Sequence, residues 1–100
     1  MYIVIRSYEL IPGTREEFIQ RVQERLVPLL NRMPGFRAFS LMEAGDNHVT
    51  FISTFNKFAD AKASARLTND WHTEHLNVFI RGYTRIAAGG VRIHQAWGRV

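Results

Sequence analysis

The first ten residues alternate in a way that predicts a β-strand, because successive side chains of a strand point to opposite faces. Residues 2–10 carry bulky side chains on both of these faces. Similar alternation occurs at 36–43, 48–55 and 91–97, and each of these segments is predicted to be a strand. Strands that are apolar on both faces are usually covered on both sides. We therefore expect neither face of the sheet to be open to water.

A segment between the first two predicted strands has the period of an α-helix, with an apolar residue at every fourth position. Thr14 and Glu17 form a capping box, which predicts that the helix starts there. Pro28 has no N–H to donate, so a kink or a tightened last turn is expected at that position.

A second helical segment is predicted between the last two strands, over 56–83. Asn56 is its expected N-cap and Gly82 its expected C-cap. The residues at 68–70 interrupt the pattern, so this second helix is predicted to be broken in two.

The predicted order is β-α-β-β-α-β, which is the ferredoxin-like arrangement of the α+β class, with an antiparallel sheet. Helices cover only one face of such a sheet. The other face is also apolar here, and the simplest cover for it is a second copy of the chain. We therefore expect a single domain over 1–100 that forms a homodimer through its sheet face.

Composition narrows the choice of function. The net charge is +4, but the arginines are scattered singly among acidic residues, so no nucleic-acid partner is expected. The segment 48–55 also lacks the glycine and the basic residue of an RNA-recognition motif. No segment has the length and hydrophobicity of a membrane span or the pattern of a signal peptide. With no cysteine in the chain, a cytoplasmic location is expected.

The stretch 69–83 places two histidines inside its apolar arc when it is drawn as a helix of about 100° per residue. His75 falls between Trp71 and Phe79, and His72 lies in the same arc. Such imidazoles either line a pocket or sit in a core with a hydrogen-bond partner. If His75 is catalytic, its role is to take a hydroxyl proton. We name His75 as the catalytic candidate, and Trp71, His72 and Phe79 as substrate-binding candidates.

Arg6 is the fourth substrate-binding candidate, because a charge in the middle of a buried strand needs a partner. That partner is an acid such as Glu9 or Glu43, which we favour, or an anionic ligand. A metal shared by the two histidines would need a third ligand, which the sequence does not bring near. No metal and no other cofactor is expected.

Three short motifs occur at predicted turns and helix starts: Ile-Pro-Gly at 11–13, Met-Pro-Gly-Phe at 33–36 and Thr-Asn-Asp-Trp-His at 68–72. With these motifs, the chain resembles the antibiotic biosynthesis monooxygenase superfamily over nearly its full length. It implies a dimeric α/β barrel with a pocket between the sheet and the second-helix region. It also implies one of three activities: cofactor-free oxidation of quinols, oxidative opening of heme, or isomerisation of a small metabolite.

The heme-degrading branch is disfavoured. That branch uses an Asn on the first strand and a Trp on the second helix, and those positions fall here on Arg6 and near Ala65. Only His75 matches, as the iron ligand. We therefore expect a cofactor-independent monooxygenase that acts on a flat aromatic or quinol-type metabolite. The alternative is a non-catalytic dimeric module that binds or senses such a small ligand.

Overall fold

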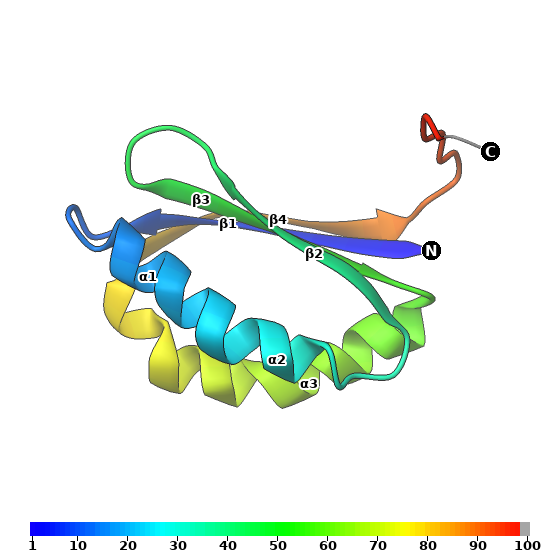
Figure 1. Ribbon diagram of the computed structural model, residues 1–100, viewed down its shortest axis with the longest axis horizontal. Helices are drawn as coiled ribbons and strands as arrows, with labels where there is room; N and C mark the ends of the chain where they lie inside the picture. Colours follow the sequence, from blue (N-terminus) through cyan, green and yellow to red (C-terminus); the bar gives the residue numbers. More distant parts are fainter. Residues whose placement is uncertain (99–100) are drawn as a thin grey trace.

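The computed structural model describes residues 1–98 as an antiparallel four-stranded sheet with helices on one face (Figure 1). The strand order is β2-β3-β1-β4, and every neighbouring pair is antiparallel. The strands are β1 (Tyr2–Leu10), β2 (Phe36–Glu43), β3 (His48–Phe55) and β4 (Ile80–Gly90). The α+β class and the ferredoxin-like order predicted from the sequence are confirmed.

The first helical segment contains α1 (Arg15–Arg21), a π turn η1 (Val22–Leu26) and α2 (Val27–Leu30). Pro28 accounts for the π turn, because it cannot donate to the carbonyl of Glu24 and the α-helical ladder cannot continue there. The Val27 N–H instead reaches back to the Val22 carbonyl. The expected irregularity is therefore present: the helix widens before Pro28, and its last turn then tightens, because the N–H groups of Arg32 and Met33 each donate to the carbonyl three residues back.

The structure confirms the predicted start of the first helix, with Thr14 as its N-cap, but it moves the N-cap of the second helix by one residue. Thr14 precedes α1, but its hydroxyl donates to the Ile11 carbonyl at 2.6 Å, so the capping box is not formed. The helix α3 (Phe58–His75) has Lys57 as its N-cap, not Asn56. The backbone N–H of Asn56 donates to the Gly35 carbonyl at 2.8 Å, which ties that residue to the turn before β2.

The predicted break in the second helix is wrong, because α3 runs without interruption through 68–70. The Thr68 hydroxyl donates to the Ser64 carbonyl at 2.9 Å. A threonine can make this bond inside a helix without ending it. Asn69 and Asp70 are exposed, so their polar side chains impose no break.

The second helix ends earlier than predicted, and the last strand lies earlier in the chain than predicted. The helix ends at His75, a short 3₁₀ turn η2 (Asn77–Phe79) follows, and β4 occupies 80–90. Although β4 contains three glycines and two alanines, it pairs along the whole length of β1. Gly82 is thus a strand residue and not a C-cap. The predicted strand at 91–97 carries no regular structure.

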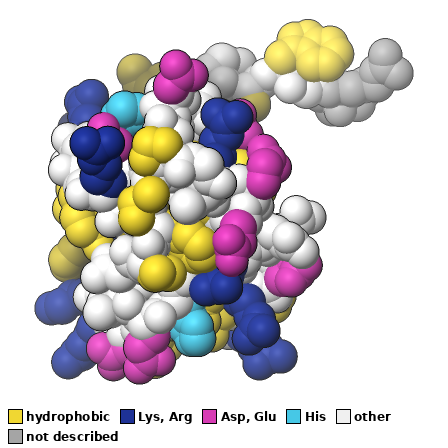
Figure 2. Space-filling view, turned by 90° about the vertical axis from the view of Figure 1, so that its left-hand side faces the viewer, with side chains coloured by type: hydrophobic (Ala, Val, Ile, Leu, Met, Phe, Trp, Pro, Cys, Tyr) yellow, Lys and Arg dark blue, Asp and Glu magenta, His cyan; other side chains and the backbone are white. Residues whose placement is uncertain are grey.

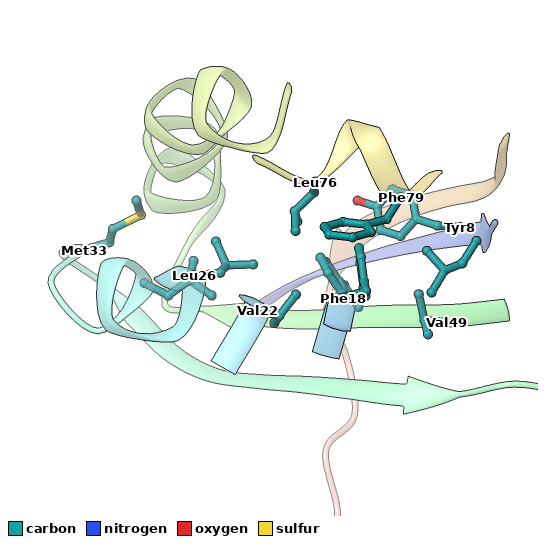
Figure 3. Packing of buried hydrophobic residues seen from close by; sticks show 11 residues of the cluster. Tyr8, Phe18, Val22, Leu26, Met33, Val49, Leu76 and Phe79 are labelled. Carbon is teal, nitrogen blue, oxygen red and sulfur yellow. The ribbon is translucent and has the colours of Figure 1, made fainter. Parts of the chain in front are cut away.

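The core lies between the helices and the face of the sheet that carries the even-numbered residues of β1 (Figure 3). Phe18 of α1 stacks on Phe51 of β3, and Leu76 is fully buried where α3 ends. The buried cluster consists of Tyr8, Leu10, Phe18, Val22, Leu26, Leu30, Met33, Val49, Phe51, Leu76 and Phe79.

The opposite face of the sheet carries no helix in the described part of the chain (Figure 1). Its centre holds Ile3, Ile5 and Ile52, which remain partly exposed. The residues after β4 leave the sheet on this same side, and their Ile93 and Trp97 are 89% and 90% exposed. This face and its neighbouring segment therefore form an uncovered apolar surface.

The third residue of the Met-Pro-Gly-Phe turn, Gly35, has to be a glycine. Its φ is +77°, and a Cβ at this position would overlap with the carboxyl group of Asp60 at the start of α3. Gly13 has a similar φ of +86°, but open space where its Cβ would lie. The turn that leads into β2 therefore needs glycine for two separate reasons.

Replacing Gly35 with alanine is expected to lower the free energy of unfolding by at least about 2 kcal/mol. The left-handed backbone accounts for about 1 kcal/mol, and the overlap with Asp60 adds to it. Gly13→Ala is the matched control, because it carries only the backbone cost. Urea unfolding of both variants measures the difference, and equal losses would contradict the role of the Asp60 contact.

Candidate functional site

A cavity of about 80 Å³ lies between the sheet and the helices. Strands β1, β2 and β3 form its floor, and α3 with the end of the first helical segment forms its roof. It is lined by Val4, Arg6, Tyr8, Leu26, Leu30, Phe39, Phe51, Ser53, Phe55, Ala61, Ser64, Ala65, Thr68 and His72. Leu26 is the last residue of the π turn, so the widened turn contributes to the wall.

Small side chains on α3 leave the space for this cavity. The helix turns one face to the sheet, with Ala61, Ser64, Ala65 and Thr68 spaced three or four residues apart. Protein interiors are otherwise close-packed, so a row of small residues opposite aromatic side chains creates a void. His72 continues this row by one more turn and closes one end of it.

His72 presents an unpaired nitrogen to this region. Its Nε2 is buried and has no hydrogen-bond partner among the described residues. Its ring lies 5.3 Å from the ring of Tyr8, centre to centre. Burial lowers the pKa of His72, and the positive charge of Arg6 lowers it further. The imidazole is therefore neutral at pH 7 and able to accept a proton.

Tyr8 lies beside His72 as a protonated phenol. The side chain is 1% exposed, and burial raises its pKa to about 12 against a partial offset from the charge of Arg6. A group with this pKa keeps its proton at any physiological pH. Tyr8 can therefore donate a hydrogen bond into the cavity but does not act as a base there.

Arg6 is the only residue in the cavity lining that carries a formal charge at pH 7. It lies on the central strand β1 and is half-buried. The two acids considered as its partners are engaged elsewhere, because Glu43 pairs with Arg15 at 3.9 Å and Glu9 pairs with His48 and Arg81. Within residues 1–98, Arg6 forms no ion pair.

Three of the sequence candidates lie outside this lining. The side chain of His75 is 40% exposed, 3.8 Å from Glu74 and stacked near Trp71 at 5.1 Å. Trp71 packs against the edge of the core, and Phe79 is a core residue with the Arg21 guanidinium over its ring. The structure thus brings Arg6 and His72 together, and Tyr8, which was not among the five site residues predicted above, is their buried neighbour.

His72 should leave a signature in the pH dependence of stability. Its pKa is about 6.5 when the chain is unfolded and lower when it is folded, so the unfolded chain binds more protons between these values. Stability should therefore fall as the pH is lowered from about 6.5 towards the folded pKa. Between pH 7 and pH 5, the melting temperature of His72→Gln should fall by less than that of the native chain. Parallel pH profiles for the two proteins would contradict this.

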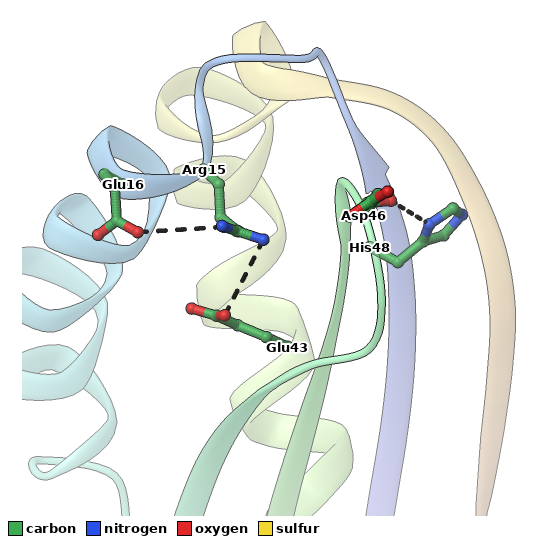
Figure 4. A network of polar contacts seen from close by, with 5 residues as sticks. All are labelled: Arg15, Glu16, Glu43, Asp46 and His48. Carbon is green, nitrogen blue, oxygen red and sulfur yellow. Dashed lines mark hydrogen bonds and ion pairs between the residues drawn. The ribbon is translucent and has the colours of Figure 1, made fainter.

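A separate polar cluster lies at the end of the domain where α1 begins (Figure 4). Arg15 pairs there with Glu16 and Glu43, and the His48 ring nitrogen lies 2.7 Å from the Asp46 carbonyl. Basic and acidic side chains are interspersed over this end of the surface (Figure 2). Throughout the described residues, no three His, Asp or Glu side chains are grouped so as to hold a metal ion.

The sequence matches the family model described as antibiotic biosynthesis monooxygenase over residues 1–68. A search of curated proteins finds no match. The matched residues include β1, which carries Arg6 and Tyr8, but they end four residues before His72. No helix among residues 1–98 is long and apolar enough to cross a membrane.

Solved structures share this fold at low sequence identity. SnoaB, a cofactor-independent oxygenase from Streptomyces nogalater, is 17% identical, with a TM-score of 0.75 and coverage of 93% of this chain and 94% of its own. MhuD, a heme-degrader from Mycobacterium tuberculosis solved with two hemes in its active site, is 19% identical, with a TM-score of 0.76 and coverage of 96% and 100%. A protein of unknown function from Nitrosomonas europaea is 14% identical, with a TM-score of 0.80 and coverage of 98% and 95%.

Proposed function

Because the chain belongs to the antibiotic biosynthesis monooxygenase family, we propose that it oxidises a small phenolic or quinol-type metabolite with molecular oxygen. The reaction takes place in the cavity beneath α3. The observation that carries this proposal is the neutral, unpaired imidazole of His72 at an otherwise apolar cavity that also holds Arg6. This combination provides a base and a positive charge next to the same substrate.

The proposed chemistry starts with a proton transfer. His72 Nε2 takes a proton from a substrate hydroxyl, and the charge of Arg6 stabilises the anion that forms. The electron-rich anion then reduces molecular oxygen at the ring CH carbon para to the hydroxyl. One oxygen atom ends as a carbonyl on that carbon, and the other leaves as water with the hydrogen of that carbon and the hydroxyl proton. The phenol thereby becomes a quinone, and no external reductant is consumed. The apolar walls limit the access of water to this anion.

His75 is the base that the sequence favoured, and it remains the alternative. Its exposed position beside Glu74 supports this role less well than the cavity position supports His72. Trp71 and Phe79 are proposed to support the site through packing, since neither lines the cavity. Arg6 and His72 are kept as substrate-binding residues.

A heme does not fit the cavity as it stands. His72 offers a nitrogen suited to iron, but a space of about 80 Å³ is small even beside the roughly 300–1,000 Å³ of sites for drug-sized ligands. We therefore derive no step through heme. The same small volume favours substrates of one or two rings that extend into the mouth of the cavity.

Oxygen uptake with single-ring and two-ring quinols tests the proposed activity. The expected result is uptake that depends on the protein, with one atom of ¹⁸O₂ recovered in the product. Binding of a quinol by calorimetry without any uptake would overturn the enzymatic proposal. That outcome would support the alternative, a module that binds or senses the ligand.

We also propose that the chain forms a homodimer through the uncovered face of its sheet. The isoleucines at the centre of that face and the exposed apolar residues after β4 support this assembly. Figure 2 shows an apolar side chain on a segment that projects from the body of the domain. A cytoplasmic location stays a prediction.

A further inference from the structure

The cavity has a positive charge that none of its own lining residues balances. Its lining contains Arg6 but no Asp or Glu. The other titratable groups facing it are Tyr8, which stays protonated, and His72, which is neutral. The remaining polar residues on the walls are neutral hydroxyls. The site therefore has a net charge of +1 in an apolar surround, and it is rich in donors.

A half-buried guanidinium without a carboxylate partner is costly, because the surrounding protein replaces part of its hydration without offering a counter-charge. Among the described residues, the acids nearest along the strands are already paired, Glu9 with His48 and Arg81 and Glu43 with Arg15. Arg6 is thus left without a carboxylate partner in the described part of the chain. The charge balance of the cavity is completed only when a ligand brings a negative group.

We propose that the ligand of this cavity is a small aromatic carboxylate, whose carboxylate binds the Arg6 guanidinium while its ring lies against Phe39 and Phe51. A guanidinium matches a carboxylate with two parallel hydrogen bonds, and the aromatic walls suit a flat ring. The Tyr8 hydroxyl is a second donor for the same anion. This inference rests on the proposed function, because it names the substrate class of the same site: a hydroxyaryl carboxylate, with its hydroxyl left for His72.

Titration with benzoate, measured by calorimetry, tests the proposal directly. The matched probe is benzamide, which has the same shape without the charge. The native chain is expected to bind benzoate at least about tenfold more tightly than benzamide, the discrimination that a charge-assisted pair supplies. Butyrate separates the contribution of the carboxylate from that of the ring and is expected to bind more weakly than benzoate. Equal binding of benzoate and benzamide, or butyrate binding as tight as benzoate, would overturn the proposal.

Variants then assign the effect to Arg6. Arg6→Gln is expected to lose at least about tenfold in benzoate affinity and to lose the preference over benzamide. Arg85→Gln removes the same charge from an exposed position on β4 outside the cavity, and it should bind benzoate like the native chain. Unchanged binding in Arg6→Gln, or an equal loss in both variants, would contradict the assignment.

Two further measurements keep the result interpretable. Thermal melts should show that Arg6→Gln is folded. If it is not, Arg6→Lys, which keeps the charge without the paired donors, should bind benzoate more weakly than both the native chain and Arg85→Gln. Oxygen uptake is measured separately with a hydroxybenzoate. Benzoate binding without uptake would refute the oxidation alone, whereas uptake that is indifferent to the carboxylate would refute this inference alone.

Discussion

Replacing His72 with alanine is expected to lower the rate of oxygen-dependent turnover by about a hundredfold or more, while His75→Ala keeps most of the activity. General base catalysis typically contributes about 10²–10⁴-fold, so loss of the base should cost that much. His72 is placed at the cavity with an unpaired Nε2, whereas the side chain of His75 is 40% exposed outside it. The measurement is the initial rate of oxygen uptake by both variants with the same quinol.

Two controls separate chemistry from folding in this comparison. His72→Ala opens space at the end of the cavity, so added imidazole should restore part of its activity, which a collapsed protein would not allow. The pH–rate profile of the native chain should show activity falling on the acid side, as His72 becomes protonated. A full loss in His75→Ala with an active His72→Ala would reverse the assignment and return the base to the residue that the sequence favoured.

The sequence predicted the layers of this fold well because its strands alternate clearly. The residues of β1 divide between the two faces as their alternation predicted, and the structure shows that Val4, Arg6 and Tyr8 are the ones that point towards the helices. The Met-Pro-Gly-Phe turn was also readable, since few residues other than glycine adopt its backbone. The alternation of a strand and the backbone of a turn depend on residues that are neighbours in the sequence. Both features are therefore the same in the folded chain as in the prediction.

The second half of the chain was harder to predict, because its structure depends on distant partners. Residues 69–83 fit a helical arc, yet 80–83 pair with β1 as the start of β4. The central strand β1 needs a hydrogen-bonded neighbour along its whole edge. This tertiary pairing outweighs the helical spacing of the apolar residues at 80–83. The same error placed Phe79 on one helix face with His72, whereas α3 ends at His75. His75 is on the helix as predicted, but only His72 of the two histidines lines the cavity.

The candidate site was predictable only in part. Arg6 was marked by the rule that a charge on a covered strand needs a partner, but the sequence could not show that Glu9 and Glu43 pair elsewhere. Tyr8 carried the signal of a polar aromatic two residues from Arg6 on the same face. The cavity itself arises from small residues on α3 opposite aromatic residues on the sheet, which depends on how the two layers meet.

Replacing Ile52 with aspartate is expected to convert the proposed homodimer to a monomer. Ile52 is central on the uncovered face of the sheet, so a dimer through that face would bury a carboxylate from each copy. An uncompensated buried charge costs on the order of 3–5 kcal/mol, which weakens association by roughly a hundredfold to several thousandfold. Size-exclusion chromatography with light scattering across a dilution series measures the shift.

The polar pair on this face is compatible with burial in such a dimer. The hydroxyls of Ser7 and Thr50 lie 2.9 Å apart and satisfy each other, so the face can lose water without leaving them unpaired. Leu67→Asp is the matched control, because Leu67 is 64% exposed on α3, on the other side of the domain. It should leave the mass unchanged. A native chain that is monomeric at high concentration, or a dimer that withstands the aspartate at Ile52, would place the contact elsewhere and leave the isoleucine face without a partner.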